Sequence, residues 1–182
     1  MKIFIIVILC FAVILVVFYA YYGGFKRLDV TLASQGGETV VYECISGDYR
    51  QTGVVMDKVY YILLNDYDIT TYKGYGKYFD NPKEVEKCHL RSEAGSIIEA
   101  KDLDMLDQLS DDFTVKTLPV EKYITVEFPY KGKISVFFSI LKVYSALNEF
   151  AHSKGYDDKG AVIEIYDIPN KKILYRKEII EE

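Results

Sequence analysis

One acidic residue lies inside an apolar, strand-like run near the C-terminus of this 182-residue chain. The run is AVIEIY, residues 161–166, and its acidic member is Glu164. Successive side chains of a strand point to opposite faces, so Glu164 shares a face with Val162 and Tyr166. In one interpretation that face is solvated. In the other it lines a crevice, where a partly desolvated Glu164 carboxylate beside Tyr166 holds a cation or accepts a proton.

Other motifs for catalysis or metal binding are missing from the sequence. Residues 74–77 (GYGK) lack the spacing of either nucleotide-binding glycine loop, and no Gly-x-Ser-x-Gly elbow is present. The two histidines are His89 and His152. Cys88 precedes His89 in a predicted strand, so the two side chains would point to opposite faces. We therefore expect no metal site, no cofactor and no assigned catalytic residue.

The N-terminal residues predict a single membrane span. From Ile3 to Tyr22 the chain has no charge, glycine or proline. About 20 helical residues cross a hydrocarbon core of roughly 30 Å. Tyrosines at the end of this run suit the membrane interface. A cleaved signal peptide is the alternative, but its apolar region would be only about 7–15 residues long and would end in small residues.

Charge bears on orientation and on partners. Lys2 and the free amino group on one side nearly balance Lys26 and Arg27 on the other, so the charges flanking the span leave its orientation open. The absence of an Asn-x-Ser/Thr site favours a cytosolic soluble domain. The net charge of −5 argues against binding nucleic acid. Cys44 and Cys88 form either a disulfide or two reduced thiols. Seventeen tyrosines and ten phenylalanines fill a core or line a pocket.

The order of predicted elements occurs twice. Each half has a strand, a helix and two strands, and each has an aromatic-Asp-x-Pro corner: YFDNP at 78–82 and YDIP at 166–169. The predicted strands and helix are 39–45, 51–65, 70–79 and 88–99 in one half, and 123–128, 133–153, 161–166 and 173–180 in the other. Between them lie a short acidic helix at 100–110 and a strand at 112–118. Duplication predicts an α+β fold, with a pseudo-two-fold antiparallel sheet, two helices on one side and a crevice between the halves.

These features resemble the GyrI-like domain of bacterial gyrase-inhibitory proteins and of multidrug-responsive transcription activators. The anchor followed by this domain is similar to the testis-expressed, endoplasmic-reticulum-anchored autophagy receptor family. The matching stretches are YFDNP, AGSII at 94–98, TVEFPY at 125–130 and IEIY at 163–166. The resemblance implies a transmembrane anchor at 1–25, a juxtamembrane linker at 26–38 and a GyrI-like domain at 39–182, with halves of about 39–99 and 120–182.

The resemblance also implies an aromatic crevice in which a glutamate meets cationic ligands. That glutamate is Glu164 here, and we predict a ligand site that also contains Tyr166, Tyr78 and Phe128. The predicted function is a single-pass module, in the endoplasmic reticulum membrane, that binds a hydrophobic or cationic small molecule or a protein partner at the cytosolic face, in connection with reticulophagy. The alternatives are an accessory subunit of a membrane protein complex, and a small hydrolase that uses Glu164 with Tyr166 or Tyr78. The expected protein partners are those of a membrane complex or of autophagy.

Overall fold

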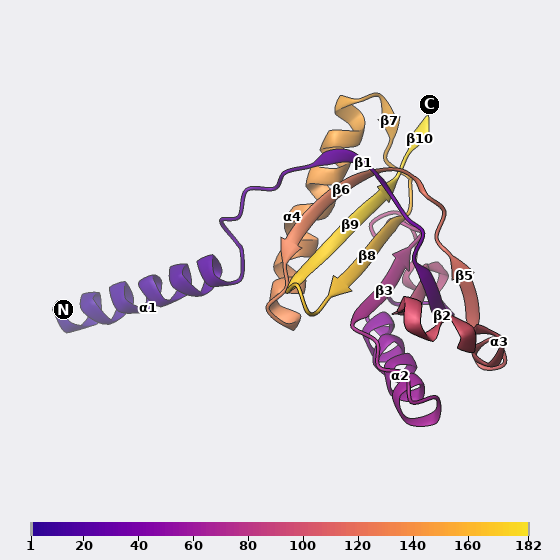
Figure 1. Ribbon diagram of the computed structural model, residues 1–182. Helices are drawn as coiled ribbons and strands as arrows, with labels where there is room; N and C mark the ends of the chain where they lie inside the picture. The colour runs from indigo at the N-terminus through magenta and orange to yellow at the C-terminus, as the bar shows by residue number, and fades with distance from the viewer. Residues whose placement is uncertain (1, 182) are drawn as a thin grey trace.

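A single antiparallel sheet organises the chain in the computed structural model, which describes residues 2–181 (Figure 1). Within these residues the sheet has eight strands in the order β1-β6-β9-β8-β3-β4-β2-β5. Their bounds are β1 Thr31–Gln35, β2 Thr39–Ser46, β3 Lys73–Tyr78, β4 Arg91–Ile98, β5 Thr114–Thr117, β6 Glu121–Pro129, β8 Val162–Asp167 and β9 Lys172–Glu178. The short strands β7 (Tyr156–Asp157) and β10 (Ile180–Glu181) form a separate pair.

The helices follow from apolar residues repeated at helical spacing. They are α1 Lys2–Tyr21, α2 Gln51–Asp66, α3 Leu106–Leu109 and α4 Lys133–Ser153, with 3₁₀ turns η1 at Lys87–His89 and η2 at Ala100–Met105. The buried residues of α4 recur every fourth position, namely Ser135, Ser139, Val143, Leu147 and Ala151. This spacing gives α4 one face that packs against the sheet. Among the described helices, α1 and α4 are long and apolar enough to cross a membrane, but the packed face identifies α4 as a core helix.

The two halves of the chain meet at the centre of the sheet. β3 pairs with β8, and the flanking order β2-β4-β3 is mirrored by β6-β9-β8. α2 packs over the first half and α4 over the second, on the same face. The predicted α+β fold with a duplicated β-α-β-β unit is therefore confirmed, and an apolar N-terminal helix precedes it.

Two long chain segments close the sheet around its other face. β1 pairs with β6 from Thr31↔Thr125 onward, and β2 pairs with β5 from Thr39↔Thr117 in the same register. Between these ladders the Gly37 amide donates to the Leu118 carbonyl, and the Leu118 amide donates to the Glu38 carbonyl, each at 2.8 Å. The segments 31–42 and 114–125 thus pair without interruption through a bend. We call this pair the closing ribbon.

The bend of the closing ribbon requires glycine at position 36. Gly36 has a φ of 127°, and a Cβ atom there would lie 1.9 Å from the Pro119 carbonyl oxygen. The backbones of the two segments therefore approach each other at Gly36 more closely than a residue with a side chain would allow. The structure also changes the description of residues 26–38, which sequence analysis treats as a linker: β1 lies within this stretch and joins the sheet.

The closing ribbon covers a second core on the face opposite the helices. Tyr75, Tyr123, Ile163 and Ile165 are each at most 3 % exposed on this face, and Leu118 of the ribbon packs with them. These side chains are buried by the curvature of the sheet itself, because α2 and α4 lie on the other side. Apolar residues therefore occur on both faces of β8, as in strands that are covered on both sides.

An ion pair between β9 and the bend holds the closing ribbon in place. Arg176 is 2 % exposed, and its guanidinium donates to both carboxylate oxygens of Glu38, at 2.9 and 2.5 Å. It also donates to the Gln35 side chain at 3.1 Å. The hydrogen bond and the positive charge of Arg176 lower the pKa of Glu38 below its ordinary value, although partial burial opposes this effect.

Removing the Arg176 guanidinium should destabilise the fold. Arg176→Met keeps an apolar stem but leaves Glu38 without its cation, and we expect a loss of about 3 kcal/mol in the free energy of unfolding. Urea denaturation followed by circular dichroism measures this loss. Lys172→Met is the matched control, because its ion pair with Glu127 is solvent-exposed and should contribute under about 1 kcal/mol. Equal losses in the two variants would show that the Arg176–Glu38 pair does not hold the ribbon.

Candidate functional site

Glu164 lies at the centre of the sheet on the face that α2 and α4 cover. Its cross-strand neighbours are Gly76 on β3 and Tyr175 on β9. The glutamate is 1 % exposed, so this face is not solvated around it. Gly76 contributes no side chain, and the ring of Tyr78 folds into the space above it: a Cβ atom at Gly76 would lie 3.3 Å from the Tyr78 hydroxyl. The glycine thus leaves room for the Tyr78 ring beside Glu164, in addition to Tyr175 on β9.

Tyrosine hydroxyls satisfy both oxygens of the Glu164 carboxylate. Tyr144 of α4 donates a hydrogen bond to Oε1 at 2.7 Å, and Tyr166 donates to Oε2. Tyr166 lies two residues along β8 and therefore on the same face. We call Tyr78, Tyr144, Tyr166 and Tyr175 the tyrosine cluster, since they surround this one carboxylate.

Each covering helix supports one further member of the tyrosine cluster. From α2, the Thr52 hydroxyl lies 3.2 Å from the Tyr78 hydroxyl. From α4, the Ser139 hydroxyl lies 2.5 Å from the Tyr175 hydroxyl. Both helices thus bring a small polar side chain to a buried surface, which fixes the tyrosine rings and satisfies their hydroxyl groups.

The electrostatics of the site are those of a buried, unneutralised acid. Burial raises the pKa of Glu164, and the hydrogen bonds from Tyr166 and Tyr144 lower it by less. Burial and the Glu164 charge together raise the pKa of Tyr144 and Tyr166 well above the ordinary tyrosine value. Within residues 2–181, no lysine or arginine forms an ion pair with Glu164. Its charge is therefore balanced only by hydroxyl dipoles.

The space between the helices is filled by side chains. Tyr78, Tyr144 and Tyr166 are half-buried, and they cover the carboxylate. Met56 of α2 approaches β3 from the side, so that a Cβ atom at Gly74 would meet its sulfur at 2.6 Å. A ligand would therefore reach Glu164 only after one or more of the tyrosine rings had rotated.

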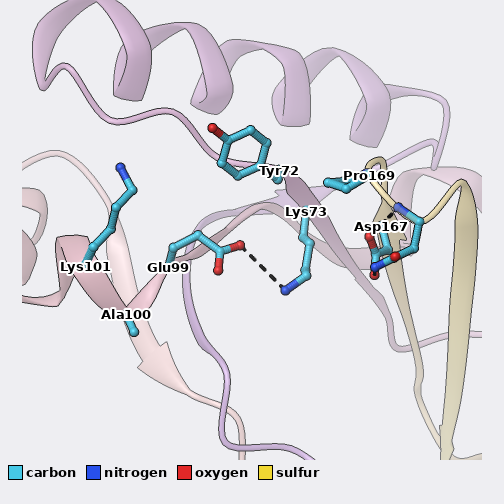
Figure 2. A pocket seen from close by; sticks show the side chains of 8 residues that line it. Tyr72, Lys73, Glu99, Ala100, Lys101, Asp167 and Pro169 are labelled. Carbon is cyan, nitrogen blue, oxygen red and sulfur yellow. Dashed lines mark hydrogen bonds and ion pairs between the residues drawn. The ribbon is translucent and has the colours of Figure 1, made fainter.

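A separate depression of 520 Å³ lies at one end of the sheet (Figure 2). Lys73 and Glu99 line it and approach each other to 3.6 Å. Asp167 lies at its other side, where it accepts hydrogen bonds from the Asn170 amide and side chain. The side chains of Asp167 and Asn170 are thus engaged with each other, and the depression does not reach Glu164.

The structure brings together three of the four predicted ligand residues. Glu164, Tyr166 and Tyr78 lie side by side, whereas Phe128 lies on β6, which is separated from β8 by β9. Phe128 is fully buried and packs against Gly23 at the end of the N-terminal helix. Tyr144 and Tyr175 were not among the predicted ligand residues. The helical spacing of Tyr144 and the alternation of Tyr175 were visible, but neither pattern identifies which strand or helix faces Glu164.

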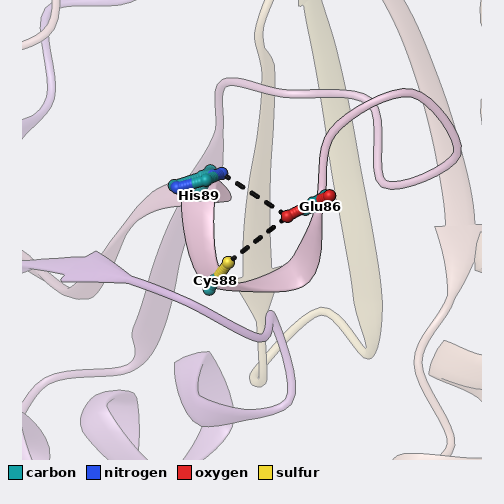
Figure 3. A group of neighbouring side chains, drawn as sticks. All are labelled: Glu86, Cys88 and His89. Atoms are coloured by element: carbon teal, nitrogen blue, oxygen red, sulfur yellow. Dashed lines mark hydrogen bonds and ion pairs between the residues drawn. The ribbon is translucent and has the colours of Figure 1, made fainter.

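The turn η1 and the residue before it gather three side chains that are able to bind a metal ion, namely Glu86, Cys88 and His89 (Figure 3). The Glu86 carboxylate lies 3.9 Å from the Cys88 sulfur and 4.0 Å from the His89 Nδ1 atom. The prediction that Cys88 and His89 lie on a strand, with side chains on opposite faces, is wrong because residues 87–89 form a 3₁₀ turn. All three side chains are exposed. Cys44 and Cys88 are both free thiols.

Comparison with known proteins identifies the fold but no close relative. No protein-family model matches the chain, and no curated protein matches it. The C-terminal domain of EcmrR superposes with a TM-score of 0.56 at 9 % identity, over 86 % of this chain and 100 % of that one. An integron cassette protein from Vibrio cholerae gives 0.55 at 14 %, over 85 % and 96 %. SAV2435 bound to tetraphenylphosphonium gives 0.51 at 13 %, over 83 % and 93 %. These likenesses agree with the GyrI-like architecture.

Stability should depend on the protonation of Glu164. Its raised pKa means that the folded state binds the proton more tightly than the unfolded chain does. The stability that this proton contributes is complete below the ordinary pKa of 4.5 and is lost as the pH rises through the raised value. Glu164→Gln removes this loss, so the variant should gain melting temperature relative to the parent chain between pH 4 and pH 8. Each tenfold difference in proton affinity corresponds to about 1.4 kcal/mol.

Differential scanning calorimetry across this pH range tests the Glu164 prediction. Glu149→Gln, at an exposed position of α4, makes the same change in net charge and serves as the control. If Glu164→Gln loses melting temperature relative to the parent as pH rises, the tyrosine hydrogen bonds outweigh burial and the predicted direction is wrong.

Proposed function

We propose that this protein is a membrane-tethered module that binds a hydrophobic organic cation at Glu164. One observation carries the proposal: a carboxylate at the centre of the sheet is 1 % exposed, has no cationic partner among the described residues, and is surrounded by tyrosines. A buried charge is unfavourable until an opposite charge compensates it. A cation beside Glu164 would supply that compensation.

The tyrosine cluster suits such a ligand. Tyrosine faces attract organic cations, and the interaction strengthens when water is excluded. Tyr130 and Tyr49 extend this aromatic surface, with ring centroids 6.1 Å from Tyr166 and 4.9 Å from Tyr78. An apolar cation would therefore find both a counter-charge and aromatic walls in one place, as is typical of small-molecule sites.

Binding would require the half-buried tyrosines to move. Rotation of Tyr144 or Tyr166 releases one carboxylate oxygen, and the incoming cation replaces the hydroxyl dipole. SAV2435, which shares this fold, has been seen with tetraphenylphosphonium, a bulky aromatic cation. The hydrolase alternative would need a carboxylate oxygen that faces water, whereas both oxygens of Glu164 accept tyrosine hydroxyls.

The helix α1 would hold this module at a membrane. Its segment Ile3–Tyr21 is apolar and long enough to cross a bilayer, and its side chains are exposed until the last turns, where Tyr19 and Tyr21 contact Phe138 and Lys131. A cytosolic orientation, a place in the endoplasmic reticulum and a role in reticulophagy stay predictions that depend on the resemblance to the receptor family. The expectation of no nucleic-acid partner likewise stays a prediction from net charge.

Tetraphenylphosphonium should stabilise the full-length protein in detergent. A ligand that binds only the folded state at 100 times its Kd adds about 2.7 kcal/mol to the free energy of unfolding. Thermal unfolding with and without tetraphenylphosphonium measures this effect. Glu164→Gln should raise the Kd for tetraphenylphosphonium at least tenfold and so reduce the stabilisation. Triphenylphosphine oxide, which is aromatic but neutral, should stabilise the parent and the variant equally.

Glu93→Gln is the matched control for the binding experiment. Glu93 is also a buried glutamate that accepts a tyrosine hydrogen bond, at 2.6 Å from Tyr75, but Lys116 neutralises it. This variant should keep the response to tetraphenylphosphonium. Equal responses in Glu164→Gln and Glu93→Gln, or no response in the parent chain, would exclude Glu164 as the site of cation binding.

A further inference from the structure

Four apolar side chains of α4 face away from the sheet. They are Ile134, Phe137, Ile140 and Leu141, with exposed fractions of 41, 60, 48 and 60 %. We call this set the outer face of α4. An exposed apolar patch of this kind is typical of a surface that contacts a membrane or another protein.

The outer face lies at the end of α4 that contacts the N-terminal helix. Tyr19 and Tyr22, at the end of that helix, pack against Phe138 with ring centroids 5.3 and 6.5 Å away. The Lys142 ammonium donates to the carbonyls of Gly24 and Lys26, at 2.6 and 2.8 Å. In Figure 1, α1 leaves the domain on the side where α4 lies.

The apolar exposure stops halfway along α4. Beyond Lys142 the exposed side chains are polar, namely Ser145, Glu149, His152 and Ser153. Only the half of the helix next to α1 is therefore apolar on its outside. A helix that merely faced water would show polar residues along its whole outer face.

Basic residues surround the same end of α4. Lys26, Arg27, Lys131 and Lys133 are exposed there. The Lys131 ammonium donates to the Tyr21 carbonyl at 2.8 Å and lies 4.1 Å from the centre of the Tyr21 ring. Basic residues beside aromatic and aliphatic ones are typical of helices that lie in a membrane interface, where they meet anionic headgroups.

We infer that the outer face of α4 lies in the headgroup region of the bilayer that α1 spans. This inference rests on the membrane anchor of the proposed function. The contacts between α1 and α4 carry the argument, since they hold the outer face next to the point where α1 leaves the hydrocarbon. A second copy of the chain is the less suitable occupant, because four side chains are too few for a stable interface, which buries about 800 Å² on each partner.

The arrangement gives α4 two functions on opposite faces. The inner face carries Tyr144, which donates to Glu164, and Ser139, which supports Tyr175. The outer face carries Phe137 and Leu141. A hydrophobic cation dissolved at the membrane surface would therefore lie within one helix diameter, roughly 10 Å, of the tyrosine cluster.

Single tryptophans test this inference, because the chain contains none. Phe137→Trp, Phe11→Trp in α1 and Tyr61→Trp on the exposed side of α2 are each introduced into the full-length protein in lipid nanodiscs. Lipids brominated near the headgroup end of the acyl chain quench tryptophans that lie at interfacial depth, about 5–10 Å into the boundary. We expect quenching for Phe137→Trp and none for Tyr61→Trp. Leu141→Trp provides a second position if Phe137→Trp lowers the melting temperature.

The remaining outcomes separate this inference from the proposed function. Lipids brominated near the end of the acyl chain should quench Phe11→Trp if α1 spans the bilayer. Quenching at Phe11 with none at Phe137 or Leu141 would overturn the inference and leave the anchor in place. Absence of quenching at Phe11 as well would show that α1 does not span the bilayer, and would contradict the membrane anchor of the proposed function. A blue-shifted but unquenched emission at Phe137 would identify a protein as the covering partner and would likewise overturn the inference.

Discussion

The uninterrupted pairing of segments 31–42 and 114–125 is the constraint on which the rest of the fold depends. Because one strand of this ribbon joins β9 and the other joins β4, the sheet must curve until its outer strands meet. The curvature buries a core around Tyr75 and Tyr123 without any helix. It also leaves β3 and β8 at the centre of the opposite face, where α2 and α4 are able to cover them.

Glu164 lies on β8, one of the two strands at the centre of the sheet. A carboxylate in the middle strand pair, beneath two helices, is shielded from water by the side chains around it, so hydroxyl groups must supply its hydrogen bonds. Tyr144, Tyr166 and the neighbouring rings do so, but they supply dipoles and not a full charge. The tyrosines therefore allow the carboxylate to be buried, and the proposed cation would supply the full opposite charge that they lack.

Much of the fold was predictable from the sequence, and so were three residues of the site, Glu164, Tyr166 and Tyr78. Periodicity and the repeated corner predicted both halves, because each helix and strand buries one regular stripe of side chains. The strand β1 was missed, since TLASQ is short and is stabilised by distant Thr125 and Glu121 rather than by its own pattern. Tyr144 and Tyr175 were missed for the same reason: helix-to-strand contacts depend on tertiary packing. The strand prediction for Cys88 and His89 failed because a local 3₁₀ turn ends the corner.

The closing ribbon also sets the order in which the chain folds. Its pairs join residues that are between 72 (Tyr42↔Thr114) and 94 (Thr31↔Thr125) positions apart, so β1 leaves the ribosome long before its partner exists. Until β6 is made, β1 presents an unpaired edge that begins ten positions after the end of α1, at Thr31 against Tyr21. Such distant pairing is slow, because a long loop must close before any contact rewards it. The closing ribbon therefore forms late, after residues 114–125 have been synthesised, and β1 is the part most exposed to aggregation or to a chaperone in the interval.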